Sequence, residues 1–99
     1  MYAIEVAEDA QAELGDLRAF ERVRIVAAIR AQLSHEPVRP ARNRKLLRGL
    51  QPPWQHLEPV WELRVGEYRV FYDVDEALKL VMVRAVRRKP PHTTTEEIL

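Results

Sequence analysis

The stretch of this chain that most constrains its fold is residues 61–72, which has the pattern of a β-hairpin. Apolar and charged residues alternate strictly over its first five positions, as in a strand with one buried face: the apolar ones are Trp61, Leu63 and Val65 and the charged ones Glu62 and Arg64. A glycine follows at position 66, and glycine accepts the positive φ angle that a tight two-residue turn requires. The sequence therefore predicts two antiparallel strands joined by a short turn.

The second arm of this hairpin is rich in aromatic and β-branched residues, which favour strands. One parity is apolar throughout, and its members are Tyr68, Val70, Tyr72 and Val74. The other parity carries Arg69, Phe71 and Asp73. We therefore expect Trp61 and its apolar neighbours to pack against helices, while Arg64 and Arg69 share an open face of the sheet together with Phe71.

Three further elements are predicted around the hairpin. Alternating residues 2–6 indicate a short first strand, and residues 79–86 a last strand with Ala85 on the buried parity and Met82 and Arg84 on the open one. A helix is expected over about residues 8–14. A longer helix ends before Pro37 and turns toward the sheet an apolar stripe that consists of Phe20, Val23, Val26, Ile29 and Leu33.

Two segments are harder to assign from sequence. Residues 37–59 are rich in proline and arginine, and we expect irregular structure there rather than a helix. At the C-terminus, Thr94 and Glu97 have the spacing of a capping box, which predicts a short helix that must dock on the rest of the chain. The whole pattern predicts an α+β fold, with an antiparallel sheet of about four strands and two N-terminal helices packed on one face.

Composition limits the class of protein. The chain has 99 residues, of which 46% are hydrophobic, so we expect residues 1–99 to form one domain. It has no cysteine, no apolar run near the roughly 20 residues of a membrane helix and no signal-peptide pattern at its N-terminus. We therefore expect a cytoplasmic protein that does not contact a membrane.

Charge is segregated along the chain although the net charge is only +1. Residues 37–57 carry five basic and no acidic residues, and so do residues 79–92. Thirteen of the sixteen cations are arginine, whose planar guanidinium binds phosphate in two-point fashion. The clusters favour a nucleic-acid partner, and the alternative is that these charges only solvate the surface, with Arg64 and Arg69 pairing acids across the strands.

Several kinds of site are not indicated by the sequence. The three histidines, His35, His56 and His92, are isolated and have no ligand partner at helical spacing, so no metal site and no cofactor is expected. Three scattered glycines cannot build a phosphate loop, and the one serine, Ser34, is not in a nucleophile motif.

The run Trp-Glu-Leu-Arg-Val-Gly-Glu-Tyr-Arg-Val-Phe-Tyr at residues 61–72, followed by Leu-Val-Met-Val-Arg-Ala-Val-Arg-Arg-Lys at residues 80–89, resembles the sheet signature of the RelE/ParE superfamily. These are toxins of type II toxin-antitoxin systems. The order of strand, two helices, Leu-x-Gly loop and three strands is also that of the family. The resemblance implies a toxin neutralised by a small acidic antitoxin that covers the basic face.

Site residues follow from the same resemblance. Arg69 matches the family's sheet arginine that binds the scissile phosphate, and Arg88 or Lys89 lies near its second basic position. In metal-free RNA cleavage, Glu62 would act as base and His92 as acid. The other cations expected to bind RNA are Arg64, Arg84, Arg87, Lys89, Arg44, Lys45 and Arg48.

Two departures from the family leave the target open. Ribosome-dependent members carry lysines where this chain has Val60 and Glu62, and many end in a catalytic tyrosine that is absent here. The function that we favour from the sequence is that of a ribosome-associated mRNA endonuclease that inhibits translation. The alternatives are a ParE-like toxin acting on DNA gyrase, or an inactive relative that serves as a binding module. A DNA-binding regulator is disfavoured because the stripe of the long helix is needed for the core.

Overall fold

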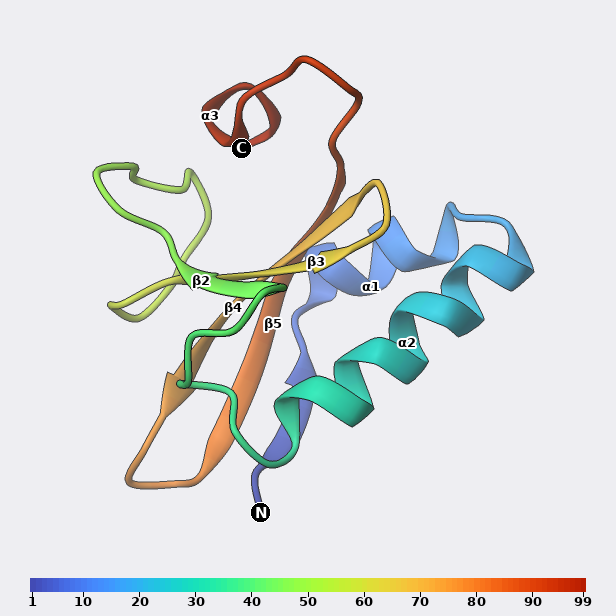
Figure 1. Cartoon of the computed structure of the whole chain (residues 1–99). Helices are drawn as coiled ribbons and strands as arrows, with labels where there is room; N and C mark the ends of the chain where they lie inside the picture. The colour runs from blue at the N-terminus through green and yellow to red at the C-terminus, as the bar shows by residue number, and fades with distance from the viewer.

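The computed structural model describes all 99 residues, and it consists of one mixed sheet with three helices (Figure 1). The strands are β1 (Ala3–Val6), β2 (Arg44–Leu46), β3 (Trp61–Val65), β4 (Tyr68–Asp75) and β5 (Leu80–Arg88). The helices are α1 (Glu8–Gly15), α2 (Ala19–Leu33) and α3 (Thr95–Ile98). None of these helices combines the length and the apolar character needed to span a membrane.

The α+β class and the central hairpin are confirmed, and the sheet differs in detail from the expectation. Its strand order is β1-β5-β4-β3-β2, so it has five strands rather than about four. It is mixed rather than antiparallel throughout, because β1 lies parallel to β5 with Ile4 opposite Val81. The extra strand is β2, which pairs with β3 inside the segment expected to be irregular. Three residues among prolines are too few for alternation to be visible in the sequence.

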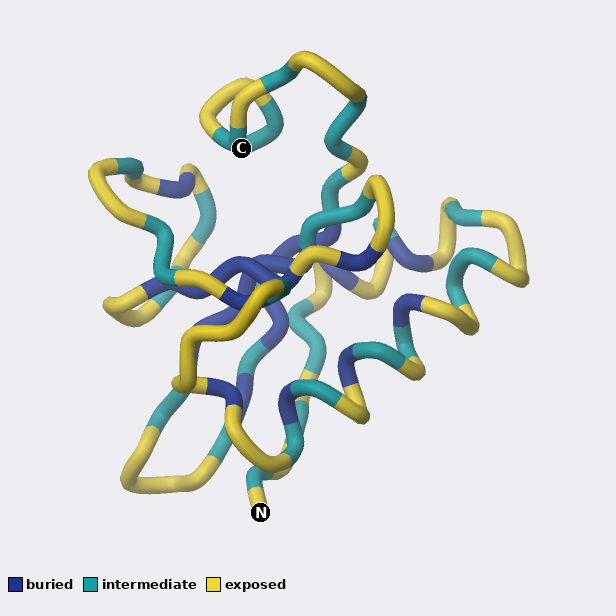
Figure 2. Tube along the Cα trace, in the orientation of Figure 1, coloured by how far each residue is buried: buried dark blue, intermediate teal, exposed yellow.

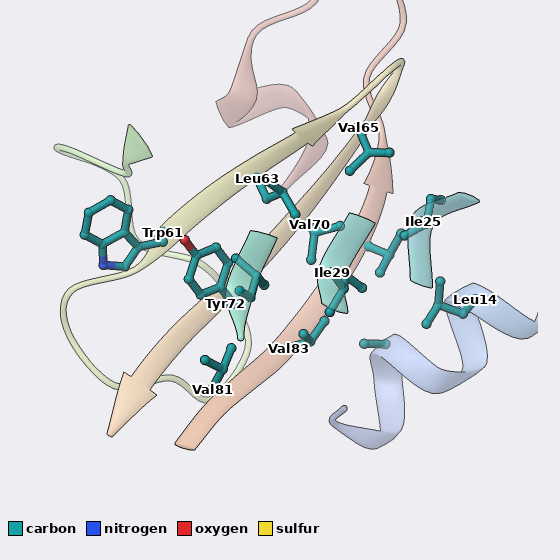
Figure 3. Packing of buried hydrophobic residues seen from close by; sticks show 13 residues of the cluster. Leu14, Ile25, Ile29, Trp61, Leu63, Val65, Val70, Tyr72, Val81 and Val83 are labelled. Atoms are coloured by element: carbon teal, nitrogen blue, oxygen red, sulfur yellow. The ribbon is translucent and has the colours of Figure 1, made fainter. Parts of the chain in front are cut away.

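The hydrophobic core lies between the sheet and the α1–α2 pair (Figures 1 and 3). The turn between β3 and β4 is formed by Gly66 and Glu67, and the positive φ of Gly66, 59°, is the one predicted. Trp61 is only 4% exposed and stacks on Tyr72, with ring centroids 6.3 Å apart. The apolar parity of both hairpin strands therefore faces the helices, as expected.

Helix α2 buries part of the predicted stripe: Ile29 and Leu33 are buried and Val26 packs against the core, as expected, but the first two members, Phe20 and Val23, face away from it. Ile25, Ile29 and Leu33 are its buried residues, whereas Phe20 and Val23 are 69% and 67% exposed. Repeated steps of three residues drift round a helix with 3.6 residues per turn, so Phe20 and Val23 lie away from the side that Ile29 and Leu33 occupy. Figure 2 shows that buried and exposed residues alternate along α2, so each turn has a buried side and an exposed side.

A β-bulge in β5 changes which residues face the core. Phe71 pairs with Ala85 but Tyr72 pairs with Val83, so Arg84 is an extra residue without a partner in the register. Ala85 therefore lies on the side of Phe71, opposite to the prediction, and Val86 joins the core. Beyond the bulge, every side chain of β5 lies on the face opposite to the one that strict alternation assigns.

The face of the sheet away from α1 and α2 is partly covered, not open. Phe71 is fully buried, because Trp54 packs on it at 5.4 Å between ring centroids and 48° between planes. Figure 1 shows the segment between β2 and β3 and the terminal helix α3 on this side of the molecule. The prediction of an exposed Phe71 was wrong, since residues 51–59 fold back over the sheet.

Tyr72 makes the stability of this core sensitive to alkaline pH. Its hydroxyl donates to the carbonyl oxygen of Pro37 at 2.6 Å, and burial raises the pKa of Tyr72 while the charge of Arg44 opposes that shift. Above about pH 10, the unfolded chain loses this proton and the folded chain keeps it, so stability should fall as pH rises.

The Tyr72→Phe variant tests this dependence by denaturant unfolding between pH 8 and pH 11. It should lose about 1 kcal/mol at neutral pH, because the carbonyl of Pro37 loses its partner, and should show a weaker decline at high pH. Tyr68 also has a raised pKa, through its hydrogen bond to Glu21 and through burial, so some decline should remain. Equal pH dependence in both proteins would contradict the assignment to Tyr72.

Candidate functional site

A hollow with a volume of about 200 Å³ opens on the sheet face that lies away from α1 and α2. None of its lining residues is hydrophobic. They are Arg42, Asn43, Lys45, Glu62, Arg64, Arg69, Lys89 and Thr95, and we call this set the basic hollow. Five cations surround a single carboxylate, so the hollow has an excess of four positive charges.

The sheet register brings these residues together. Lys45 of β2 lies opposite Glu62 of β3, and Arg64 of β3 lies opposite Arg69 of β4. Lys89 directly follows β5, where its backbone N–H donates to the carbonyl of Glu67 at 2.6 Å. Segments 44 residues apart in sequence, from Lys45 to Lys89, thus contribute cations to one surface.

Glu62 is the one acidic residue of the hollow, and three other lining residues contact its carboxylate. Alternation predicted an open sheet face for this residue, but it is only 2% exposed, because β2 and α3 cover it. The Oγ1 of Thr95 donates to its Oε1 at 3.2 Å, Lys45 Nζ is 3.4 Å from Oε2, and Arg69 Nε is 3.8 Å from Oε1. A buried carboxylate needs such partners, since removing a charge from water without them is costly.

Arg69 is held rigidly beside Glu62. Its guanidinium donates from Nη1 to the carbonyls of Gly66 and Tyr68, both at 2.9 Å, and its side chain is 15% exposed. Burial lowers the pKa of Arg69, while Glu62 opposes that shift and Arg64 adds to it. Like charges directly opposite each other on neighbouring strands are destabilising. The pairing of Arg64 with Arg69 is therefore unfavourable by itself, and an anion bound between the two guanidinium groups would relieve their repulsion.

Two arginines that were predicted to bind RNA, Arg44 and Arg84, instead make hydrogen bonds to other groups of the protein. Arg44 is 9% exposed and donates to the side-chain oxygen of Gln32 at 2.6 Å, the carbonyl of Gln32 at 3.2 Å and the carbonyl of Arg39 at 3.1 Å. Arg44 pairs with Leu63, which places it on the helix side of the sheet. Arg84, at the bulge, binds Asp73 through two hydrogen bonds of 2.8 and 3.2 Å.

Four other predicted site residues also lie outside the hollow. Arg87 pairs with Glu13, donates to the carbonyl of Ile98 at 3.0 Å and lies 5.2 Å from the Trp54 ring. The bulge turns Arg88 to the opposite face, where it binds Glu67 at 3.2 Å.

His92 and Arg48 are both exposed, and neither of them lines the hollow. The backbone of His92 has a φ of 66°, in the left-handed region.

Five of the predicted site residues line the hollow, namely Glu62, Arg64, Arg69, Lys45 and Lys89. Their functional roles remain predictions. Sequence reasoning missed its other three residues, which are Arg42, Asn43 and Thr95. Arg42 belongs to the basic segment 37–57, so charge clustering was a signal for it. Nothing in the sequence indicated that a threonine of the terminal helix would reach a carboxylate 33 residues earlier.

A mixed sheet with two helices on one face is also the fold of solved RelE toxins. The toxin-antitoxin complex RelBE2 from Mycobacterium tuberculosis is similar, with a TM-score of 0.70, 25% identity, and coverage of 89% of this chain and 98% of that one.

Two further structures show the same fold. The isolated Escherichia coli RelE toxin has a TM-score of 0.69 and 21% identity, covering 98% of this chain and 94% of that one. The RelE-RelB complex from Pyrococcus horikoshii OT3 has a TM-score of 0.69 and 22% identity, covering 93% and 98%.

Sequence comparison identifies the family. Residues 4–89 match the family described as the ParE toxin of the type II toxin-antitoxin system, parDE. The chain therefore belongs to this family, and the resemblance to RelE/ParE toxins is confirmed. No curated protein matches the chain by sequence.

Proposed function

We propose that this type II toxin is a metal-independent endonuclease that cuts mRNA on the ribosome and so inhibits translation. The observation that supports this proposal is the basic hollow, in which five cations surround one buried carboxylate. Phosphodiester cleavage through a pentavalent transition state adds negative charge at the phosphate, and preorganised cations stabilise such charge most where water is excluded.

Each reacting group has a candidate in the hollow. Glu62 accepts the proton of the RNA 2′-hydroxyl, whose oxygen then bonds to phosphorus as the bond from phosphorus to the 5′-oxygen breaks. Arg64 and Arg69 stabilise the charge on the non-bridging oxygens. Lys89 lines the hollow where His92 does not, so Lys89 is our candidate for the proton donor to the leaving 5′-oxygen.

Action on DNA gyrase is the second candidate. Two observations favour it: the matching family is that of ParE, and His92, the acid that the resemblance implied, does not line the hollow. In that case the hollow would bind a target without chemistry of its own.

Neutralisation by an antitoxin is part of the proposal. Similar structures include complexes of RelE with RelB, so such partners bind relatives of this fold. An acidic segment that places carboxylates near Arg64, Arg69 and Lys89 would occupy the hollow and would fold as it binds. The excess of four positive charges is complementary to such a segment.

Inducing the protein in cells separates the two candidate targets. We expect new mRNA 5′ ends, mapped across the transcriptome, that are phased with codons and appear within minutes of induction. A parallel supercoiling assay should show no gyrase-linked DNA breaks. Breaks without new RNA ends would support the gyrase candidate and contradict the nuclease.

The Glu62→Gln variant tests the base directly. Glutamine has nearly the same shape and can still accept the hydrogen bond from Thr95, but it cannot take a proton, so cleavage should fall roughly 10²-fold or more. The measurement is the rate at which cut ends accumulate. Glu67→Gln is the matched control, because Glu67 is an acid outside the hollow that pairs with exposed Arg88. Unchanged cleavage by Glu62→Gln would leave Glu62 as a structural partner of Arg69 only.

A further inference from the structure

The carboxylate of Glu62 accepts one hydrogen bond, and its donor belongs to the terminal helix α3. The Oγ1 of Thr95 donates to Oε1 of Glu62 at 3.2 Å, although the two residues are 33 positions apart in the sequence. The cations beside the carboxylate form ion pairs at longer distances, which are 3.8 Å from Arg69 Nε to Oε1 and 3.4 Å from Lys45 Nζ to Oε2. Thr95 is therefore the closest partner of this buried carboxylate, and it carries no charge of its own.

The two oxygens of the Glu62 carboxylate differ in how firmly they are held. Oε1 accepts from Thr95 and lies beside Arg69, whose side chain is 15% exposed and bound to two backbone carbonyls. Oε2 has one neighbour, Lys45, whose side chain is 70% exposed. An ion pair with an exposed lysine contributes little to stability, so Lys45 can turn from Oε2 to a phosphate of the substrate. Oε2 is consequently the oxygen that is left to accept a proton.

The position of Thr95 depends on how α3 is attached to the sheet. The helix has only four residues, none of them buried, and a helix of that length is not stable alone. The carbonyl oxygen of its last residue, Ile98, accepts from Nε of Arg87 at 3.0 Å. Arg87 is fixed in turn by its ion pair with Glu13 of α1. The hydroxyl of Thr95 is therefore held at Glu62 by polar contacts rather than by burial of the helix.

We propose that Thr95 is a positioning residue for Glu62. A general base acts efficiently only when it is held within hydrogen-bonding reach of the proton that it abstracts. The hydroxyl of Thr95 fixes Oε1 and so orients Oε2 as the oxygen that takes the proton of the RNA 2′-hydroxyl. The proposal rests on the proposed function for the role of Glu62 as base. Thr95 exchanges no proton with the RNA, so the bonds that form and break are those of the cleavage step described above.

Two substitutions of Thr95 test the hydroxyl itself. Thr95→Val keeps nearly the same shape and removes the donor. On mRNA bound to ribosomes, kcat should fall about tenfold while KM stays within about twofold, because misorientation of a reacting group slows chemistry more than it weakens binding. Thr95→Ser keeps the Oγ and should restore kcat to within about twofold of the original chain.

Thr93→Val is the matched control from the same C-terminal segment. The hydroxyl of Thr93 donates to the carbonyl of Pro90 at 2.6 Å, and Thr93 does not line the hollow. This variant should keep the kcat of the original chain. The positioning role would be overturned by an unchanged kcat in Thr95→Val, by a Thr95→Ser variant as slow as Thr95→Val, or by an equal loss in Thr93→Val.

NMR tests the contact without any cleavage and so separates this proposal from the proposed function. In the full chain labelled with carbon-13, the side-chain carboxyl resonance of Glu62 should move in Thr95→Val and return in Thr95→Ser. The resonance of Glu67, an acid outside the hollow, should stay in place. A response of Glu62 in a protein that cuts no RNA would refute the nuclease and support the orientation of the carboxylate by Thr95. An unchanged Glu62 resonance would overturn the proposal, even if the protein cuts RNA.

Discussion

Replacing Arg69 by alanine should abolish toxicity and leave the protein folded. Arg69 is the most constrained cation of the hollow, held by two backbone carbonyls and 3.8 Å from Glu62. Removing one preorganised group that stabilises transition-state charge typically lowers a rate about 10²- to 10³-fold. Because a toxin acts on a growing cell, a loss of that size should restore growth after induction.

The structure also predicts a small cost in stability for this variant. Arg69 donates two hydrogen bonds and is partly buried, so its loss should cost about 1–2 kcal/mol, which is less than the 5–15 kcal/mol typical of folded proteins. Denaturant unfolding of the purified variant measures this cost. Arg30→Ala is the control for loss of an arginine elsewhere, and it should remain toxic. A folded Arg69→Ala protein with full toxicity would exclude the hollow as the functional site.

The placement of Arg64 and Arg69 was predictable because it depends only on local rules. Alternation fixes the face of each side chain, and Gly66 fixes a two-residue turn, so the register of β3 with β4 follows. Those two facts place Arg64 opposite Arg69, whatever the rest of the chain does. The same reasoning put Trp61 and Tyr72 into the core.

The predictions failed where a single insertion or a distant contact decides the outcome. Alternation assumes an unbroken ladder, and the bulge at Arg84 reverses the faces of all later residues, which removes Arg88 from the site. Arg44 gave no signal of burial, because its partner Gln32 lies on a helix twelve residues earlier. Charge clustering identified the cationic segment but could not separate arginines that serve the fold from those that serve the site.

The covering of the second sheet face was unpredictable for a related reason. Residues 51–59 have no periodic pattern, yet they place Trp54 on Phe71. Alternation alone therefore suggested a broad open platform. The structure contains a smaller polar hollow, which is bounded by residues at β2 and by α3.

The Trp61→Ala variant should unfold the protein rather than alter its site. Trp61 is 4% exposed and stacks on Tyr72 at 17° between ring planes (Figure 3). Truncating a large buried aromatic residue costs about 3–5 kcal/mol, because it removes apolar burial and leaves a cavity. In a domain of this size that loss should lower the melting temperature by at least about 12 °C.

The chain contains a matched control of the same residue type. Trp54 lies on the opposite face, is partly exposed, and its indole Nε1 is buried without a hydrogen-bond partner. Its packing on Phe71 is therefore offset by an unsatisfied donor, and Trp54→Ala should cost less than Trp61→Ala. Thermal unfolding of both variants measures the difference. If Trp61→Ala were the milder change, the apolar parity of β3 would not face the helices, and Arg64 and Arg69 could not line the basic hollow.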